Sequence, residues 1–170
     1  GFQLTKQLLD FAGGGRYEVK PTNLNEIVRE TSIMFGREKD NLTIHAEYQE
    51  GIWMVEADRG QIEQVLLNLY SNAWQSMPGE GEINLHTENI ILDRRASYRL
   101  GVGPGRYVKI SVIDTLADMD DTTQQRIFEP FFTAKEMGRG DGLGLASAYG
   151  IIKNHGGIIN VYSKKGEGTT

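Results

Sequence analysis

The chain has 170 residues, a length that suits one domain with a single hydrophobic core. Its formal net charge is -5 and its basic residues are scattered, so it lacks the basic stripe of a nucleic-acid binder. The absence of cysteine excludes disulfides and thiolate metal sites and fits a cytoplasmic location, and no apolar run reaches the roughly 18 residues of a membrane span.

The N-terminal part is predicted to be helical. Residues 4–12 have apolar side chains at helical spacing and end at the glycines 13–15, which we interpret as a helix stop and linker. A second helix is expected from Asn23, its N-cap, to about Lys39. Its apolar stripe consists of Leu24, Ile27, Val28, Thr31, Met34 and Phe35.

Strands and one long helix are predicted for the middle of the chain. Residues 42–48 alternate apolar and polar like a strand, and 52–57 are expected to be their antiparallel neighbour across a turn. Asp58 then caps a helix that runs to Met77. Further strands are expected at 83–91 and 107–114, with a loop between them at 92–106.

The C-terminal third is predicted to hold a short helix at 122–128, a glycine-rich segment, a helix at 145–155, a strand at 158–163 and a turn at 166–169. Strands and helices alternate irregularly, and the strands resemble hairpin partners. This pattern indicates an α+β fold, a two-layer sandwich of a mixed β-sheet backed by α-helices.

Four amide side chains lie on one line of the predicted helix before Met77: Gln64, Asn68, Asn72 and Gln75. Amide oxygens can ligate Mg²⁺ without adding the negative charge that would repel a triphosphate. The alternative interpretation is a solvated polar face.

Two further features have both a ligand-binding and a structural interpretation. Residues 138–144 carry alternate glycines and open directly into a helix, so backbone N–H groups and the positive helix end can face an anion. A flexible lid without a ligand is the alternative. Asp114 ends a predicted strand, where it can accept a hydrogen bond from an amine such as that of adenine, or form a turn.

In chain order, five segments resemble the five ATP-binding motifs of sensor histidine kinases. The N box is matched by NLYSNA (68–73), the G1 frame by Asp114-Thr115 with Met119-Asp120, the F box by RIFEPFFTAK (126–135), the G2 box by 140–150, and the G3 box by GEGT (166–169). Phe-Glu-Pro-Phe-Phe followed by Thr and Lys is most similar to the nitrogen-regulation and hybrid-kinase branch.

The resemblance implies the Bergerat ATP-binding fold with ATP and Mg²⁺ as cofactors. Asn72 would hold the metal and Asp114 the adenine amine, while Asn68 and Lys135 would be the catalytic residues, Lys135 reaching the phosphates. The other nucleotide-binding residues would be Gly140, Gly142, Leu143, Gly144 and Thr169.

The resemblance also implies the surroundings of the domain. Residues 1–15 would be the tail of an upstream dimerisation and phosphoacceptor helix, and 16–170 the catalytic domain, with its C-terminal strand truncated. Its partners would be that upstream domain, which supplies the acceptor histidine, and a response regulator receiver domain. The parent would be a homodimer, with no direct membrane contact in this piece. The histidines within the chain are expected to be structural.

Several ligand positions depart from the family pattern. The G1 box normally has two glycines where Leu116 and Asp118 stand, and Asp141 lies between the G2 glycines. If the first glycine needs a positive φ, Leu116 costs about 1–2 kcal/mol. An alternative hypothesis is therefore a nucleotide-binding-impaired pseudokinase that acts as a scaffold or signalling module.

A third hypothesis is a stand-alone ATPase of the same fold. Related ATPases place a glutamate one helical turn before the metal-binding asparagine, where it activates water as a general base. Asn68 occupies that position here and cannot take a proton, which favours a kinase.

Overall fold

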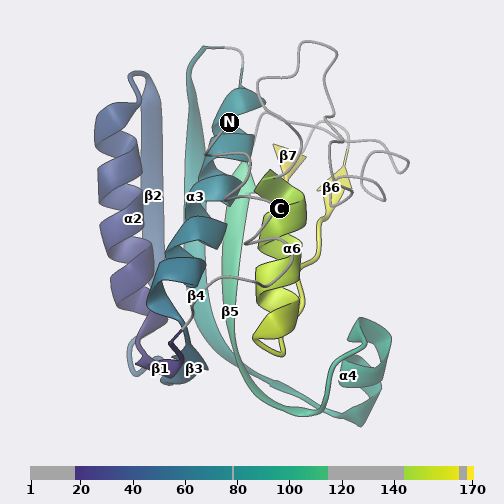
Figure 1. The fold of residues 1–170 in the computed structure, drawn as a ribbon. Helices are drawn as coiled ribbons and strands as arrows, with labels where there is room; N and C mark the ends of the chain where they lie inside the picture. The colour runs from purple at the N-terminus through teal and green to yellow at the C-terminus, as the bar shows by residue number, and fades with distance from the viewer. Residues whose placement is uncertain (1–17, 78, 115–143, 165–167) are drawn as a thin grey trace, which may run out of the picture.

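The computed structural model describes residues 18–77, 79–114, 144–164 and 168–170. In this part of the chain a five-stranded mixed sheet has the strand order β2-β4-β5-β7-β6, and helices α2, α3 and α6 cover one of its faces (Figure 1). The predicted α+β two-layer sandwich is confirmed. The elements are β1 (Lys20–Thr22), α2 (Leu24–Glu38), β2 (Leu42–Tyr48), β3 (Val55–Ala57), α3 (Arg59–Gln75), β4 (Gly81–Leu92), α4 (Arg94–Leu100), β5 (Gly105–Asp114), α6 (Gly144–Asn154), β6 (Ser163–Lys164) and β7 (Gly168–Thr169).

Helix α2 begins as predicted, because the Asn23 side chain accepts a hydrogen bond from the backbone N–H of Asn25. The predicted stripe is buried except at one position. Met34 is 46% exposed, because the buried face turns through Thr31, Ser32 and Phe35 and leaves Met34 beside it.

Helix α3 lies at the centre of the helical layer, between α2 and α6 (Figure 1). Asp58 caps it by accepting from the N–H of Gln61 at 2.9 Å. Its buried side chains pack onto the sheet and α2, and fully buried Tyr70 bonds through its hydroxyl to Thr31 of α2 at 3.0 Å. The main core thus sits between α2, α3 and the β2–β4–β5 part of the sheet.

The prediction that residues 52–57 pair with β2 is wrong. Only Val55–Ala57 form a strand, and this β3 pairs with β1, while β2 pairs in parallel with β4. Parallel neighbours need a crossover, and α3 supplies it. The loop before β3 is instead held by Asn89 of β4, whose side chain accepts from Trp53 N at 2.9 Å and donates to the Gly51 carbonyl at 3.1 Å.

The predicted loop at 92–106 contains helix α4. Asp93 caps its start by accepting from the N–H of Ala96, and Gly101 ends it in a left-handed conformation with φ 73°. The glycines of this segment thus include a helix stop, which the prediction had assigned to a loop. Arg94 and Arg95, expected in a loop, are the first residues of this helix.

The C-terminal strands also differ from the prediction. Residues 158–162 are not strand, β6 covers only Ser163–Lys164, and the expected turn at 166–169 provides strand β7 at Gly168–Thr169. Tyr162 and Thr170 still exchange two backbone hydrogen bonds, of 2.8 and 2.7 Å. Helix α6 is found where a helix at 145–155 was predicted. The helices predicted at 4–12 and 122–128 lie outside the described residues.

Candidate functional site

The predicted site residues fall into two groups. Asn68 and Asn72 lie on α3, Asp114 ends β5, Gly144 begins α6, and Thr169 is in β7. Asp114 pairs with Thr169, and the Asn68 side chain bonds to Gly144. Figure 1 shows β5 finishing and α6 beginning at the same end of the sandwich. The second group lies outside the described residues: Lys135, Gly140, Gly142 and Leu143, together with Leu116, Asp118 and Asp141.

Asp114 and Thr169 are direct cross-strand neighbours. In the same register Asp114 also lies opposite Ile83, which is fully buried under the helices. Residues paired directly across a ladder point to the same face of a sheet. Asp114, which is 3% exposed, and Thr169 therefore both face the helical layer. The structure thus brings together two residues that are 55 positions apart and that were both predicted to bind the nucleotide.

Two contacts fix α6 antiparallel to α3. At its start, the Gly144 carbonyl accepts from the Asn68 side-chain amide at 2.9 Å. At its end, the His155 ring nitrogen Nε2 accepts from the backbone N–H of Asp58 at 3.1 Å, and Nδ1 lies 2.8 Å from the Ile151 carbonyl oxygen. The contacts bring the start of α6 beside the amide stripe of α3, and they support a structural role for His155.

The amide stripe is divided into separate hydrogen-bonded pairs. Gln64 donates to the Asn68 side-chain oxygen at 2.8 Å, whereas Gln75 donates to the Ser71 hydroxyl at 3.2 Å. Within the described part of the chain, no side chain is hydrogen-bonded to the Asn72 amide. Of the four amides, Asn72 is therefore the one most readily offered to a ligand.

This donor set fits a magnesium nucleotide. A neutral amide oxygen suits Mg²⁺, the start of an 11-residue helix favours an anion, and a buried carboxylate can accept from an amine. No cluster of three or more histidine, aspartate or glutamate side chains able to hold a metal occurs among the described residues.

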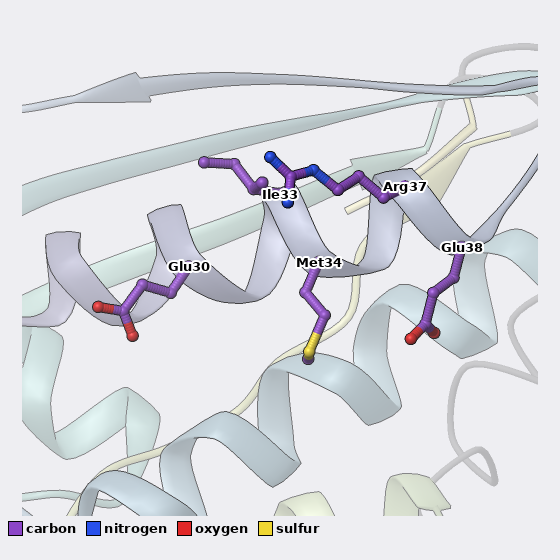
Figure 2. A pocket seen from close by; sticks show the side chains of 5 residues that line it. All are labelled: Glu30, Ile33, Met34, Arg37 and Glu38. Carbon is purple, nitrogen blue, oxygen red and sulfur yellow. The ribbon is translucent and has the colours of Figure 1, made fainter.

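A surface hollow lies elsewhere, on the outer side of α2. Figure 2 shows the side chains around it, which come from successive turns of α2 alone and include no predicted site residue. They are Glu30, Ile33, Met34, Arg37 and Glu38. Of the described helices, none combines the length and apolar character that a bilayer span requires.

The other two histidines lie on the sheet face away from the helices. His45 is 4.0 Å from Glu82, and His86 is 3.4 Å from Glu47, each pair joining β2 and β4. These cross-strand contacts are consistent with the structural role predicted for both residues.

Sequence reasoning missed Gln64 as the partner of Asn68 and His155 as the partner of Asp58. The first was accessible, because residues four apart on a helix are neighbours and both are amides. The second joins residues 97 positions apart, and no local pattern signals such a contact.

Comparisons with known proteins give a consistent result. A family model described as histidine kinase-, DNA gyrase B-, and HSP90-like ATPase matches residues 57–170. Sensor kinase CckA of Brucella abortus (strain 2308) is 38% identical over 170 residues, which cover 98% of this chain and 18% of that protein. The chain spans between 18% and 33% of the length of the first curated relatives that it matches.

Solved structures agree with these matches. The catalytic domain of histidine kinase ThkA has 30% sequence identity and a TM-score of 0.70, covering 89% of this chain and 91% of that one. A structure of ThkA in complex with response regulator protein TrrA has 26% identity and a TM-score of 0.71, covering 99% of this chain and 45% of that one.

Proposed function

We propose, because this chain belongs to the histidine kinase-, DNA gyrase B-, and HSP90-like ATPase family, that it is the catalytic domain of a bacterial two-component sensor histidine kinase. It would bind Mg²⁺-ATP and donate the γ-phosphate to a histidine of an upstream helical domain. The observation that carries the proposal is the 2.9 Å bond between Asn68 and Gly144, since it joins the N-box match on α3 to the G2-box match at α6.

The proposed binding roles follow the donor types. Asn72 would ligate the magnesium ion, and the first turn of α6, with Gly144, would face the phosphates. Asp114 would accept from the adenine amine, with Thr169 beside it across the ladder. By the motif resemblance, Lys135, Gly140, Gly142 and Leu143 would complete the phosphate contacts.

Kinase activity is favoured over ATP hydrolysis by the chemistry of Asn68. An amide cannot remove a proton from water, and here the Asn68 oxygen already accepts from Gln64. The nucleotide supplies the transferable phosphoryl group, while the protein positions it and stabilises its charge. Such a site suits transfer to a group on another protein domain.

The proposed partners extend beyond this chain. An upstream phosphoacceptor domain, to which residues 1–15 would lead, would supply the acceptor histidine, and a receiver domain would take the phosphoryl group from it. The receiver proposal is supported by the ThkA complex with its response regulator. We propose a cytoplasmic, homodimeric parent on the same family grounds.

Calorimetric titration of Mg²⁺-ATP into the 170-residue chain tests the proposal. We expect saturable binding that Asn72→Ala abolishes and that Gln75→Ala, on the same helix but bonded to Ser71, leaves intact. No heat at millimolar ATP from a chain shown to be folded would refute nucleotide binding.

The second candidate, a pseudokinase scaffold, is motivated by Leu116 and Asp118 in the G1-box match. It predicts no binding by the unmodified chain and recovery in the double variant Leu116→Gly/Asp118→Gly. Binding of equal affinity by both chains would exclude it.

A further inference from the structure

We infer that Asn68 is a positioning residue, oriented by Gln64, that holds the first turn of α6 against α3 and does not ligate the metal. The inference deepens the proposed function, on which its nucleotide consequence rests. The relay itself, Gln64 to Asn68 to Gly144, is a property of the chain alone.

The orientation of the Asn68 amide follows from its two partners. The carbonyl of Gly144 can only accept a hydrogen bond, so Asn68 must present its NH₂ group there, at 2.9 Å. Its oxygen then faces Gln64, which must donate in turn, at 2.8 Å. The backbone carbonyl thus determines the direction of both bonds.

This direction excludes the Asn68 oxygen from the site. An amide that donates to Gly144 has its oxygen turned toward Gln64, whose side chain is on the solvent side of α3. Asn72, one turn further along α3, is not engaged by any side chain in the described ranges. The two asparagines therefore have different roles: Asn68 positions α6, and Asn72 is the proposed metal ligand.

The relay matters because it lies at the start of α6. The buried apolar side chains of α6 are Ala146, Ala148 and Ile151, and Val65 of α3 belongs to the same cluster as the last two. The His155 contact with Asp58 secures the opposite end of the helix. The Asn68–Gly144 bond is a polar contact at the end of α6 that would face the phosphates.

Hydrogen–deuterium exchange of the nucleotide-free chain tests the relay, read at the amides of residues 148–150. Asn68→Leu keeps the side-chain volume but removes both hydrogen-bonding groups. Losing one net hydrogen bond should speed exchange there about fivefold. Unchanged exchange in a variant whose circular dichroism and melting match the parent chain would overturn the inference.

Two substitutions at Gln64 separate the relay from simple electrostatics. Gln64→Lys keeps a donor toward Asn68 and should leave exchange unchanged, whereas Gln64→Glu offers only an acceptor, reverses the amide and should speed exchange. A direct charge effect at the positive start of α6 predicts the opposite order, because a carboxylate stabilises that end and an ammonium does not. The opposite order would refute the relay.

A double variant and a matched control complete the test. Gln64→Glu added to Asn68→Leu should cause no further increase, since Gln64 acts only through Asn68. Additive effects would contradict the relay. The control is Gln75→Ala, which should leave exchange at residues 148–150 unchanged, because Gln75 lies on the same helix but bonds to Ser71, outside the relay.

Nucleotide titration then separates this inference from the proposed function. Asn68→Leu should weaken Mg²⁺-ATP binding about fivefold without moving its dependence on Mg²⁺ concentration. An altered Mg²⁺ dependence would identify Asn68 as a ligand and overturn the inference. If the unmodified chain binds no nucleotide, the proposed function fails, and the exchange experiment still decides the relay.

Discussion

The two outer helices of the layer are attached to the domain in different ways. Helix α2 and its neighbours share one large core that includes the fully buried Ile27, Val28, Tyr70 and Ile83. Helix α6 buries smaller apolar side chains, Ala146, Ala148 and Ile151, and is also held by polar contacts near its two ends. Both helices lie on the same face of the sheet, beside α3 (Figure 1).

The difference means that the α2 side contributes more to the free energy of unfolding, whereas the α6 side can change its packing more easily. Elements with few buried apolar contacts open at lower free energy than the core around them. The candidate site lies at the α6 side, where the Asn68 side chain bonds to the first residue of α6. The large core on the α2 side keeps the domain folded while contacts at α6 change.

Matched core truncations provide the largest test of this comparison. Ile27→Ala should cost about 4 kcal/mol of the free energy of unfolding. Ile151→Ala should cost about 2 kcal/mol, because Ile151 belongs to a smaller cluster in which Leu69, Ile152 and Ile159 are only partly buried and can relax into the gap. Urea denaturation followed by circular dichroism measures both. Equal or reversed costs would remove the distinction between the two sides.

The alkaline limit of stability should originate on the α2 side. Burial raises the pKa of Tyr70 to about 12. An unfolded tyrosine ionises near pH 10, so the stability contributed by the neutral phenol is complete below about pH 10 and is lost as the pH rises toward about 12. The total loss should be about 2–3 kcal/mol.

Tyr70→Phe should remove this decline of the free energy of unfolding with pH, measured by denaturation curves recorded between pH 9 and 12. At neutral pH the variant should lose about 1 kcal/mol, because Thr31 loses its hydroxyl partner. Tyr98→Phe is the matched control, since Tyr98 is 89% exposed, and it should keep the full slope. A steep slope retained in Tyr70→Phe would assign it to other groups.

The polar attachment of α6 should give a smaller effect than the Ile27→Ala truncation. His155→Ala removes the acceptor for the Asp58 N–H and the ring contact with Ile151, and should cost about 1–2 kcal/mol. Hydrogen exchange should accelerate at the start of α3 and the end of α6. His45→Ala, on the exposed sheet face, should change stability by less than about 0.5 kcal/mol. Equal effects of the two variants would contradict the attachment.

Much of the fold was predictable because local signals agreed with it. Asn23 and Asp58 cap helices as predicted, and the spacing of apolar residues located α2, α3 and α6. The pairing of strands was not predictable, since β1 and β7 are only a few residues long and are strands only because they pair with residues distant in the sequence. Helix α4 was missed because its segment has no apolar period and its capping glycine resembled a loop residue.

The candidate site was predictable as a set of residue types, mainly from the order of its motifs. The structure adds the geometry that joins Asp114 to Thr169 and Asn68 to Gly144. The amide line itself was partly misleading, because Gln75 bonds to Ser71 and not along the line. Helical spacing alone does not show which side chains pair when several donors and acceptors are within reach. The roles of Lys135 and the G2 glycines before Gly144 stay predictions.

The short reach of β7 has a consequence for the behaviour of the domain in solution. β7 meets β5 only at Asp114, and in the described part of the chain no strand lies along the outer edge of β5 from Gly105 to Ile113. A strand edge without a partner can pair with a strand of another chain, and exposed charged side chains on the strand oppose such pairing. In β5 the exposed charged side chains are those of Arg106 and Lys109. The positive charges of two copies of the strand repel each other, and high salt screens this repulsion. Concentrated samples should therefore aggregate edge to edge more readily as ionic strength rises.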